Sequence, residues 1–150
     1  MNEMISPSTI YFDHPAKTKG ELLAFVAHQA FQNGISSSEA GLLQDLENRE
    51  NEISTGLQDG FAIPHAKSRH VLKPAVMFVR TKEPIPWETL DGSPVSCVFS
   101  LLVPEVNEGN LHLKMLSKLA VNLMDEDFKS SIASSQDPDK LAAFILAAVD

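Results

Sequence analysis

The sequence has one cysteine, a minority of basic residues and no long apolar stretch, and each shortage excludes a class of protein. Cys97 alone cannot form an internal disulfide, and no Cys–His spacing resembles a zinc site. Lys and Arg number 12 against 20 Asp and Glu, so the net charge is −8, and no Lys/Arg run exceeds two residues. This balance disfavours nucleic acid and anionic lipid as partners, but it is compatible with a small anion at one local site.

The N-terminus and the apolar runs give no sign of a membrane or secreted protein. The longest apolar run, VFSLLV, is too short to cross a bilayer. The first residues lack the basic-then-apolar order of a signal peptide. We therefore expect a protein of the reducing cytoplasm.

The chain does have enough apolar sequence for one compact domain. Its 150 residues are 43% hydrophobic and include no low-complexity tract, so we expect a single domain over residues 1–150. Helical periodicity and caps predict helices over about 18–33, 36–50, 111–124 and 137–149. Strands are predicted at 75–81 and 94–103, with short ones at 51–54, 61–63 and, at a sheet edge, 84–87. The pattern indicates an α/β fold, in which a small mixed sheet of about five strands is flanked by α-helices.

The stretch TGLQDGFAIPHAKS, residues 55–68, presents one histidine on a restricted backbone. Gly56 and Gly60 permit positive φ angles and close approach by another group. Pro64 fixes its own φ and biases Ile63 toward an extended conformation, so the ring of His65 is held in a defined place. This favours a reactive imidazole. Glycine with proline also marks ordinary turns, so a purely structural His65 is the competing interpretation.

Two further residues are candidates for the same site. His112 follows the 94–103 strand and lies in the first turn of the next predicted helix, where anions and the ligands of α/β sheets gather. A histidine on this apolar helical face is also typical of a hydrogen-bonded core residue. Arg49 would place a planar donor for phosphate oxygens beside the glycine loop, or it is only a solvated charge at a helix end.

A metal-binding protein that uses His65, His70 and His112 is a further alternative. The spacing from His65 to His70 does not suit one helical face, and Pro64 argues against a helix there. We therefore expect no metal and no cofactor.

Several motifs occur in the order found in one known family: RE at 49–50, STG at 54–56, DGFAIPHAKS at 59–68, PV at 94–95 and HLKMLSKLA at 112–120. On these motifs, the chain from about residue 5 to 149 resembles the enzyme IIA domains of the fructose–mannitol class (EIIA type-2) of the bacterial phosphoenolpyruvate-dependent sugar phosphotransferase system. The resemblance implies that His65 is the phosphorylated nucleophile, His112 the neighbouring histidine and Arg49 the stabilising cation. It also implies a mixed sheet flanked by helices.

The function implied by the resemblance is phosphoryl transfer without a metal or cofactor. His65 would accept phosphate from the phosphocarrier HPr and pass it to enzyme IIB during uptake of a fructose- or mannitol-like sugar, with membrane contact only through the IIC permease. A neutral imidazole suits this role because it attacks phosphorus without an added base. An apolar rim of Leu57, Phe61 and Ile63 is expected around the nucleophile. The alternative is a regulatory EIIA-like protein whose phosphorylation state controls partner binding.

Overall fold

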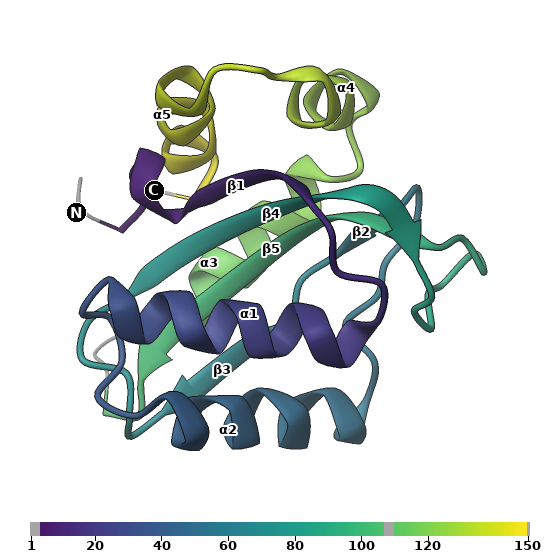
Figure 1. Cartoon of the computed structure of the whole chain (residues 1–150). Helices are drawn as coiled ribbons and strands as arrows, with labels where there is room; N and C mark the ends of the chain where they lie inside the picture. The colour runs from purple at the N-terminus through teal and green to yellow at the C-terminus, as the bar shows by residue number, and fades with distance from the viewer. Residues whose placement is uncertain (1–3, 107–109, 150) are drawn as a thin grey trace.

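The chain folds into a mixed five-stranded sheet with helices on both faces (Figure 1). The structure, a computed structural model, describes residues 4–106 and 110–149, with the side chains of Leu111 and His112 outside the description. The elements in chain order are the 3-10 helix η1 (Pro7–Thr9), β1 (Ile10–His14), α1 (Lys19–Gln32), α2 (Glu39–Glu52), β2 (Phe61–Ala62), β3 (His65–Ser68), β4 (Ala75–Ile85), β5 (Val95–Pro104), α3 (Leu111–Asn122), α4 (Glu126–Ser134) and α5 (Pro138–Val149). The predicted α/β class, with about five strands flanked by helices, is confirmed.

The sheet is built around the antiparallel pair of β4 and β5. Strand β1 joins β4 in parallel, whereas β2 and β3 both join the other side of β5 in parallel and in the same register. The two short strands therefore form one edge with a gap. Pro64 has no N–H to donate to β5, and the Ile63 N–H donates to the Thr55 carbonyl at 3.0 Å, so the ladder is interrupted there on its donor side, although the Pro64 carbonyl still accepts the Leu101 N–H of β5 at 3.3 Å. It resumes at His65.

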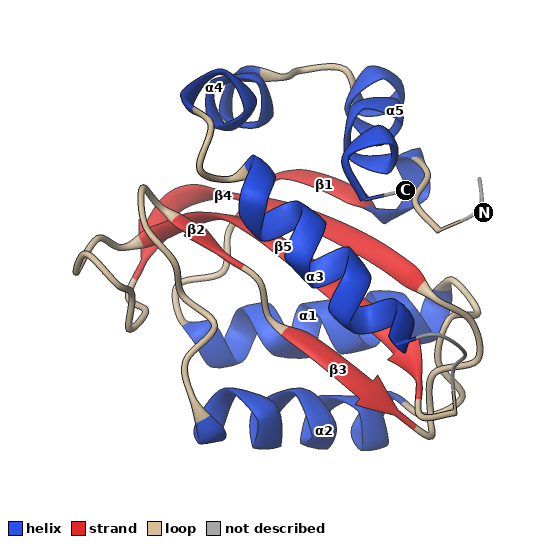
Figure 2. Ribbon diagram, turned by 180° about the vertical axis from the view of Figure 1, so that it is seen from behind, coloured by secondary structure: helices blue, strands red, loops and turns tan. Residues whose placement is uncertain are grey.

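Alternate residues of β4 and β5 face two separate apolar cores. One core lies under α3, α4 and α5, and the other lies under α1 and α2 (Figures 1 and 2). The first includes Phe78, Phe99, Leu119 and Ile145, and the second includes Met77, Val98, Leu22 and Leu46. Cys97 is buried in the first core, as its place in a central strand predicts, and burial raises the pKa of its thiol to about 11.

Three helices begin at the residues that the sequence indicates. Thr18, Ser38 and Asp137 each accept a hydrogen bond from a backbone N–H of the first turn, at 3.0 to 3.1 Å, which satisfies a donor that the helix leaves free. Helix α4 is not among the predicted elements. Its apolar residues Phe128 and Ile132 give a single i,i+4 pair, which is too short a pattern to identify a helix.

Two of the predicted strands are wrong. The segment 51–54 is not a strand, because α2 runs to Glu52 and Ile53 is its C-cap. The segment 84–87 is not a separate edge strand, because its first two residues complete β4, where Ile85 pairs with Val95. Strands β1 and β3 were not predicted; the four residues of β3, HAKS, are too short and polar to show a strand pattern.

Candidate functional site

His65 is the first residue of β3, where the sheet edge resumes after Pro64. Along this strand Ala66 and Ser68 are buried, whereas His65 is half-buried and Lys67 is exposed. Successive residues of a strand face opposite sides, so the buried pair fixes the strand while the other pair faces outward. The ring of His65 is therefore held by the sheet and remains accessible from one side.

The two ring nitrogens of His65 have different partners. Nδ1 lies 2.8 Å from the carbonyl oxygen of Ile63, and Nε2 lies 3.1 Å from Nε of Arg49. A carbonyl oxygen only accepts and a guanidinium only donates hydrogen bonds, so these contacts require a proton on Nδ1 and a lone pair on Nε2. In this arrangement the lone pair of the ring is on Nε2, beside Arg49.

Arg49 reaches His65 from the last turn of α2. Its NH1 group also donates to the Ile53 carbonyl at 2.8 Å, beyond the end of the helix. A cation is favourable at this end, where helix carbonyls lack intrahelical partners. Leu42 and Leu46, earlier in α2, are buried in the core beneath the helix and set its orientation. The structure thus brings two of the three candidate residues together.

A groove of about 470 Å³ opens beside His65. Its lining comes from α2, β3 and α3: Asp45, Asn48, Arg49, Glu52, His65, Ala66, Lys67, Leu113 and Leu116. Figure 2 shows β3 running between these two helices. His112 belongs to the first turn of α3, but its side chain lies outside the described residues, so its position beside His65 stays a prediction.

The apolar rim of the site is formed by other residues than those expected. Phe61 and Ile63 are each 3% exposed, because both pack into the core under α3 and α5, and Leu57 is half-buried. Among the described side chains, the exposed Leu113 lines the groove, and the exposed Ile53 follows α2 and accepts a hydrogen bond from Arg49 on its carbonyl. The expected rim is therefore wrong at Phe61 and Ile63.

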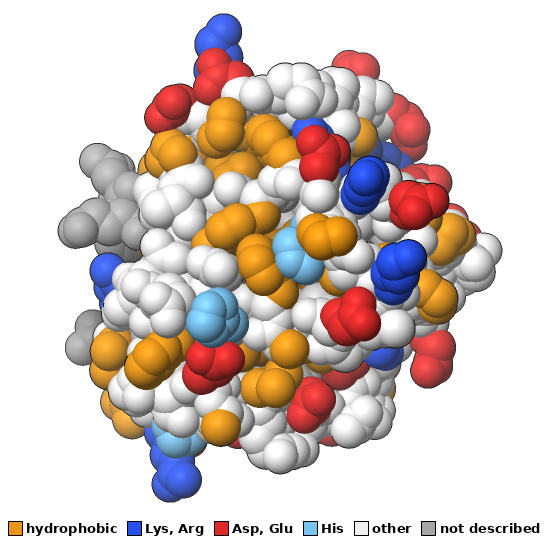
Figure 3. All heavy atoms as spheres, in the orientation of Figure 1, with side chains coloured by type: hydrophobic (Ala, Val, Ile, Leu, Met, Phe, Trp, Pro, Cys, Tyr) orange, Lys and Arg blue, Asp and Glu red, His pale blue; other side chains and the backbone are white. Residues whose placement is uncertain are grey.

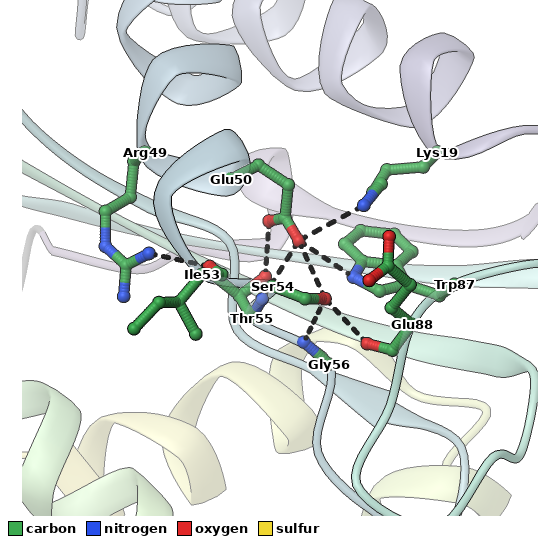
Figure 4. A network of polar contacts seen from close by, with 9 residues as sticks. All are labelled: Lys19, Arg49, Glu50, Ile53, Ser54, Thr55, Gly56, Trp87 and Glu88. Carbon is green, nitrogen blue, oxygen red and sulfur yellow. Dashed lines mark hydrogen bonds and ion pairs between the residues drawn. The ribbon is translucent and has the colours of Figure 1, made fainter.

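Glu50, the neighbour of Arg49, is a functional candidate that the sequence analysis missed. Its carboxylate is buried and accepts hydrogen bonds from Thr55 N and Oγ1, Ser54 Oγ, Trp87 Nε1 and Lys19 Nζ (Figure 4). Burial raises the pKa of this carboxyl, but the hydrogen bonds from Thr55, with Lys19 and Ser54, outweigh burial and lower the pKa overall. The signal in the sequence was an acidic residue in the last turn of a helix, closely followed by small hydroxyl residues.

The loop from α2 to β2 is held by contacts along its length. A Cβ at Gly56 would lie 2.3 Å from the Glu88 carbonyl oxygen, so close approach requires glycine there, as expected. Gly60 has the predicted positive φ, at 86°, and Asp59 before it has a φ of 59°. Lys129 of α4 forms an ion pair with Asp59. The loop is thus fixed at its start and at its turn.

The described part of the chain has neither a cluster of metal ligands nor a helix that could cross a membrane. No group of three or more His, Cys, Asp or Glu side chains within residues 4–106 and 110–149 is placed to hold a metal ion. None of the described helices is long and apolar enough to cross a bilayer. On the face seen in Figure 3, basic side chains alternate with acidic ones and form no continuous patch.

Comparisons with known proteins give a consistent set of relatives. Residues 3–148 match the family described as "Phosphoenolpyruvate-dependent sugar phosphotransferase system, EIIA 2". The fructose-specific EIIA component of Haloferax volcanii is 35% identical over 127 residues, which cover 85% of this chain and 82% of that protein. The fructose-specific EIIABC component of Bacillus subtilis is 30% identical over 97% of this chain, but the chain spans only 23% of that protein.

Solved structures share the fold. The nitrogen regulatory protein IIA-Ntr of Neisseria meningitidis has a TM-score of 0.88 and 33% identity, with 96% of this chain and 97% of that chain covered. The IIA-Mtl chain in a complex with phosphorylated enzyme IIB-Mtl from Escherichia coli has a TM-score of 0.77 and 21% identity, with 93% and 95% covered. At that lower identity, the likeness shows the fold alone.

Proposed function

The chain belongs to the EIIA 2 family of the phosphoenolpyruvate-dependent sugar phosphotransferase system, and we propose on this basis that His65 carries a phosphoryl group between two proteins. The observation that supports the proposal most directly is the state of the His65 ring. Nδ1 is hydrogen bonded to the Ile63 carbonyl, and Nε2 holds a lone pair next to the guanidinium of Arg49. A phosphoryl carrier of this kind needs such a nitrogen and such a cation.

The transfer step uses the two nitrogens in different ways. The lone pair of Nε2 attacks phosphorus and forms an N–P bond, while the bond from phosphorus to the donor breaks and its electron pair returns to the donor. Nδ1 keeps its proton, and the Ile63 carbonyl continues to accept a hydrogen bond from it. Arg49 releases Nε2 and donates to the phosphoryl oxygens, whose charge it offsets. His112 supplies a second donor from the first turn of α3.

The proposed partners are the phosphocarrier HPr as donor and an enzyme IIB as acceptor. A half-buried histidine in an open groove suits two successive brief contacts, and the exposed Leu113 and Ile53 offer apolar area to either partner. The similarity to the fructose-specific EIIA component supports a fructose-like or mannitol-like sugar as the transported substrate. The complex of a same-fold IIA with phosphorylated IIB supports the acceptor.

A regulatory role is the second candidate. It is favoured by the similarity to a nitrogen regulatory protein IIA-Ntr, at 33% identity over nearly the whole of both chains. The same phosphorylated His65 would then change which protein the chain binds, rather than supply a transporter.

The test of the proposal is incubation of the protein with phosphoenolpyruvate, enzyme I and HPr, followed by mapping of the acid-labile phosphate. The His65→Ala variant should fold and remain unlabelled, while His28→Ala, a change at an exposed histidine of α1, should be labelled like the wild type. His112→Ala should be labelled more slowly. Full labelling of His65→Ala at another residue would contradict the proposal.

The two roles are then separated with a cognate enzyme IIB. Rapid loss of label to enzyme IIB supports sugar transport. Retention of the label, with a different set of proteins bound before and after phosphorylation, supports regulation.

A further inference from the structure

We propose that Glu50 is a positioning residue for His65, which fixes the loop that holds Nδ1 and so keeps the lone pair of Nε2 facing the groove. The inference deepens the function proposed above and rests on it. Glu50 belongs to the RE motif at 49–50 that carries the resemblance, but the resemblance gives it no role, and the transfer step described above does not use it. Its role is argued from the contacts of its carboxylate.

An unbroken series of hydrogen bonds leads from Glu50 to the ring of His65. Glu50 accepts from the backbone N–H of Thr55 at 2.9 Å and from its hydroxyl at 2.6 Å. The carbonyl of Thr55 accepts the N–H of Ile63 at 3.0 Å. The carbonyl of Ile63 is the partner of His65 Nδ1 at 2.8 Å. Each link fixes the backbone that carries the next, so a shift at Thr55 is transmitted to the proton on Nδ1.

Glu50 and Arg49 clamp the same short segment from two sides. Arg49 donates to the Ile53 carbonyl, while Ser54 and Thr55 donate to Glu50 (Figure 4). The hydroxyl of Ser54 also lies 2.6 Å from the Glu88 carbonyl. Residues 53–55 are therefore held in one place relative to α2, and α2 is the helix that supplies Arg49. The nucleophile and its cation are therefore oriented by the same segment.

A buried carboxylate is a costly way to stabilise this position. It lies at the C-terminal end of α2, where the helix dipole disfavours negative charge. Its one cationic partner, Lys19, is at 3.4 Å and partly exposed. A packed apolar side chain would often give equal or greater stability than a buried charge. What the carboxylate adds is direction, because its two oxygens lie within hydrogen-bond distance of five donors from three segments, one of which, the Ser54 hydroxyl, shares its single proton with the closer Glu88 carbonyl.

The test compares Glu50→Gln with a control that loses stability elsewhere. Glutamine keeps the size of the side chain but turns a donor group toward donors, so the contact with Thr55 is lost or rotated. Ile145→Ala removes packing from the core under α5, on the opposite face of the sheet from α2, and serves as the control for reduced stability alone. Nitrogen NMR of the His65 ring reports the tautomer without any phosphorylation.

The expected result is specific to the His65 ring. In Glu50→Gln, a mixture of tautomers replaces the Nδ1–H form, and the rate of phosphorylation by phospho-HPr falls by about 10- to 100-fold, as is typical when reacting groups are misplaced. A fraction of the phosphate then appears on Nδ1. Ile145→Ala keeps the wild-type tautomer and the wild-type site of phosphorylation. Thr55→Val, which removes only the 2.6 Å hydroxyl contact, shows a smaller change in the same direction.

The outcomes separate this inference from the proposed function. If folded Glu50→Gln keeps the wild-type tautomer and rate, the positioning role is overturned, while phosphorylation of wild-type His65 still stands. If Glu50→Gln does not fold, the same result in Thr55→Val overturns the positioning role. An unphosphorylated wild-type protein overturns the proposed function. In that case, the tautomer measurement still decides whether Glu50 orients the ring.

Discussion

Glu50 and Lys129 both bury a charge against the loop that leads to His65, but they are held in different surroundings. The Glu50 side chain is 3% exposed, and most of its donors are neutral groups of nearby backbone and side chains. The Lys129 side chain is 9% exposed and pairs with the carboxylates of Asp59 and Glu126, which are 51% and 84% exposed. The first contact is enclosed by protein, and the second opens to solvent through its partners.

This difference assigns separate roles to the two ends of the loop. Exposed ion pairs are screened by water and salt and are worth little on average. Buried hydrogen bonds to a charge are stronger, and a partner left unpaired costs more than the bond contributed. The loop is therefore held more firmly at Thr55, which is linked to His65 through Ile63, than at Asp59, whose ion pair opens to solvent.

Truncation of the two charges gives the largest expected effect. Glu50→Ala leaves the buried donors of Thr55 and Trp87 unpaired beside a cavity, and we expect it to lower the free energy of unfolding by about 3 to 5 kcal/mol. Lys129→Ala should lower it by less, because Asp59 and Glu126 are left in contact with water. Urea unfolding of both variants measures the difference.

An equal loss of stability in Lys129→Ala and Glu50→Ala would contradict this difference between the two contacts. High salt provides the control. High salt should lower the free energy of unfolding of the wild type, because it screens the ion pairs of Lys129. It should not change the loss of stability that Glu50→Ala causes.

Two glycines of the loop provide an intermediate effect. A Cβ at Gly56 would lie 2.3 Å from the Glu88 carbonyl oxygen, so we expect Gly56→Ala to cost about 2 to 3 kcal/mol through displacement of backbone. A Cβ at Gly60 would meet Ser96 Oγ at 3.3 Å, a tight contact that a small shift of that side chain relieves, so mainly the positive φ opposes Gly60→Ala, at about 1 to 2 kcal/mol. Thermal unfolding measures both.

Gly34→Ala is the matched control for Gly60→Ala. Gly34 also has a positive φ, at 72°, and its Cβ would meet no atom within 4 Å. Its cost measures the backbone effect alone. Equal costs for Gly56→Ala and Gly60→Ala would mean that the loop adjusts at Gly56 as easily as at its turn.

Parts of the fold differ in how far the sequence predicted them. The cap at Thr18, the central strand around Cys97, the close approach at Gly56 and the positive φ of Gly60 follow from local residue chemistry, and the structure has them. Strand β3 could not be read locally, because HAKS becomes a strand only through its pairing with β5. The edge position of His65 is thus a result of tertiary pairing.

The candidate site was predictable in part for the same reason. The residue types of His65 and Arg49 suggested their chemistry, but their 3.1 Å contact depends on the packing of α2 beside β3. Glu50 was missed because its donors come from segments 31 positions before it and 37 positions after it in the sequence, as well as from the adjacent loop. No periodic pattern records contacts of that range.

Titration gives the smallest expected effect, because a protonated Glu50 still fills its space and still accepts some hydrogen bonds. Its folded-state pKa is lowered, so the stability it contributes is complete above its ordinary pKa and is lost as the pH falls through the folded value. The hydrogen bonds with Asp59 and Glu126 raise the pKa of Lys129, so its contribution is complete below the ordinary lysine pKa and is lost as the pH rises through the folded value. Acid should weaken the start of the loop, and alkali should weaken its turn.

Unfolding free energies at acid and alkaline pH test this, with fluorescence of the single tryptophan, Trp87, as a local probe, since its indole N–H donates to Glu50 at 3.2 Å. Glu50→Gln should flatten the acid dependence, apart from a remainder from Asp91, whose pKa its hydrogen bonds with Ser93 and Asp59 lower to about 2. Lys129→Met should flatten only the alkaline dependence, and an unchanged acid dependence in Glu50→Gln would show that the carboxylate is not the group through which acid loosens the loop.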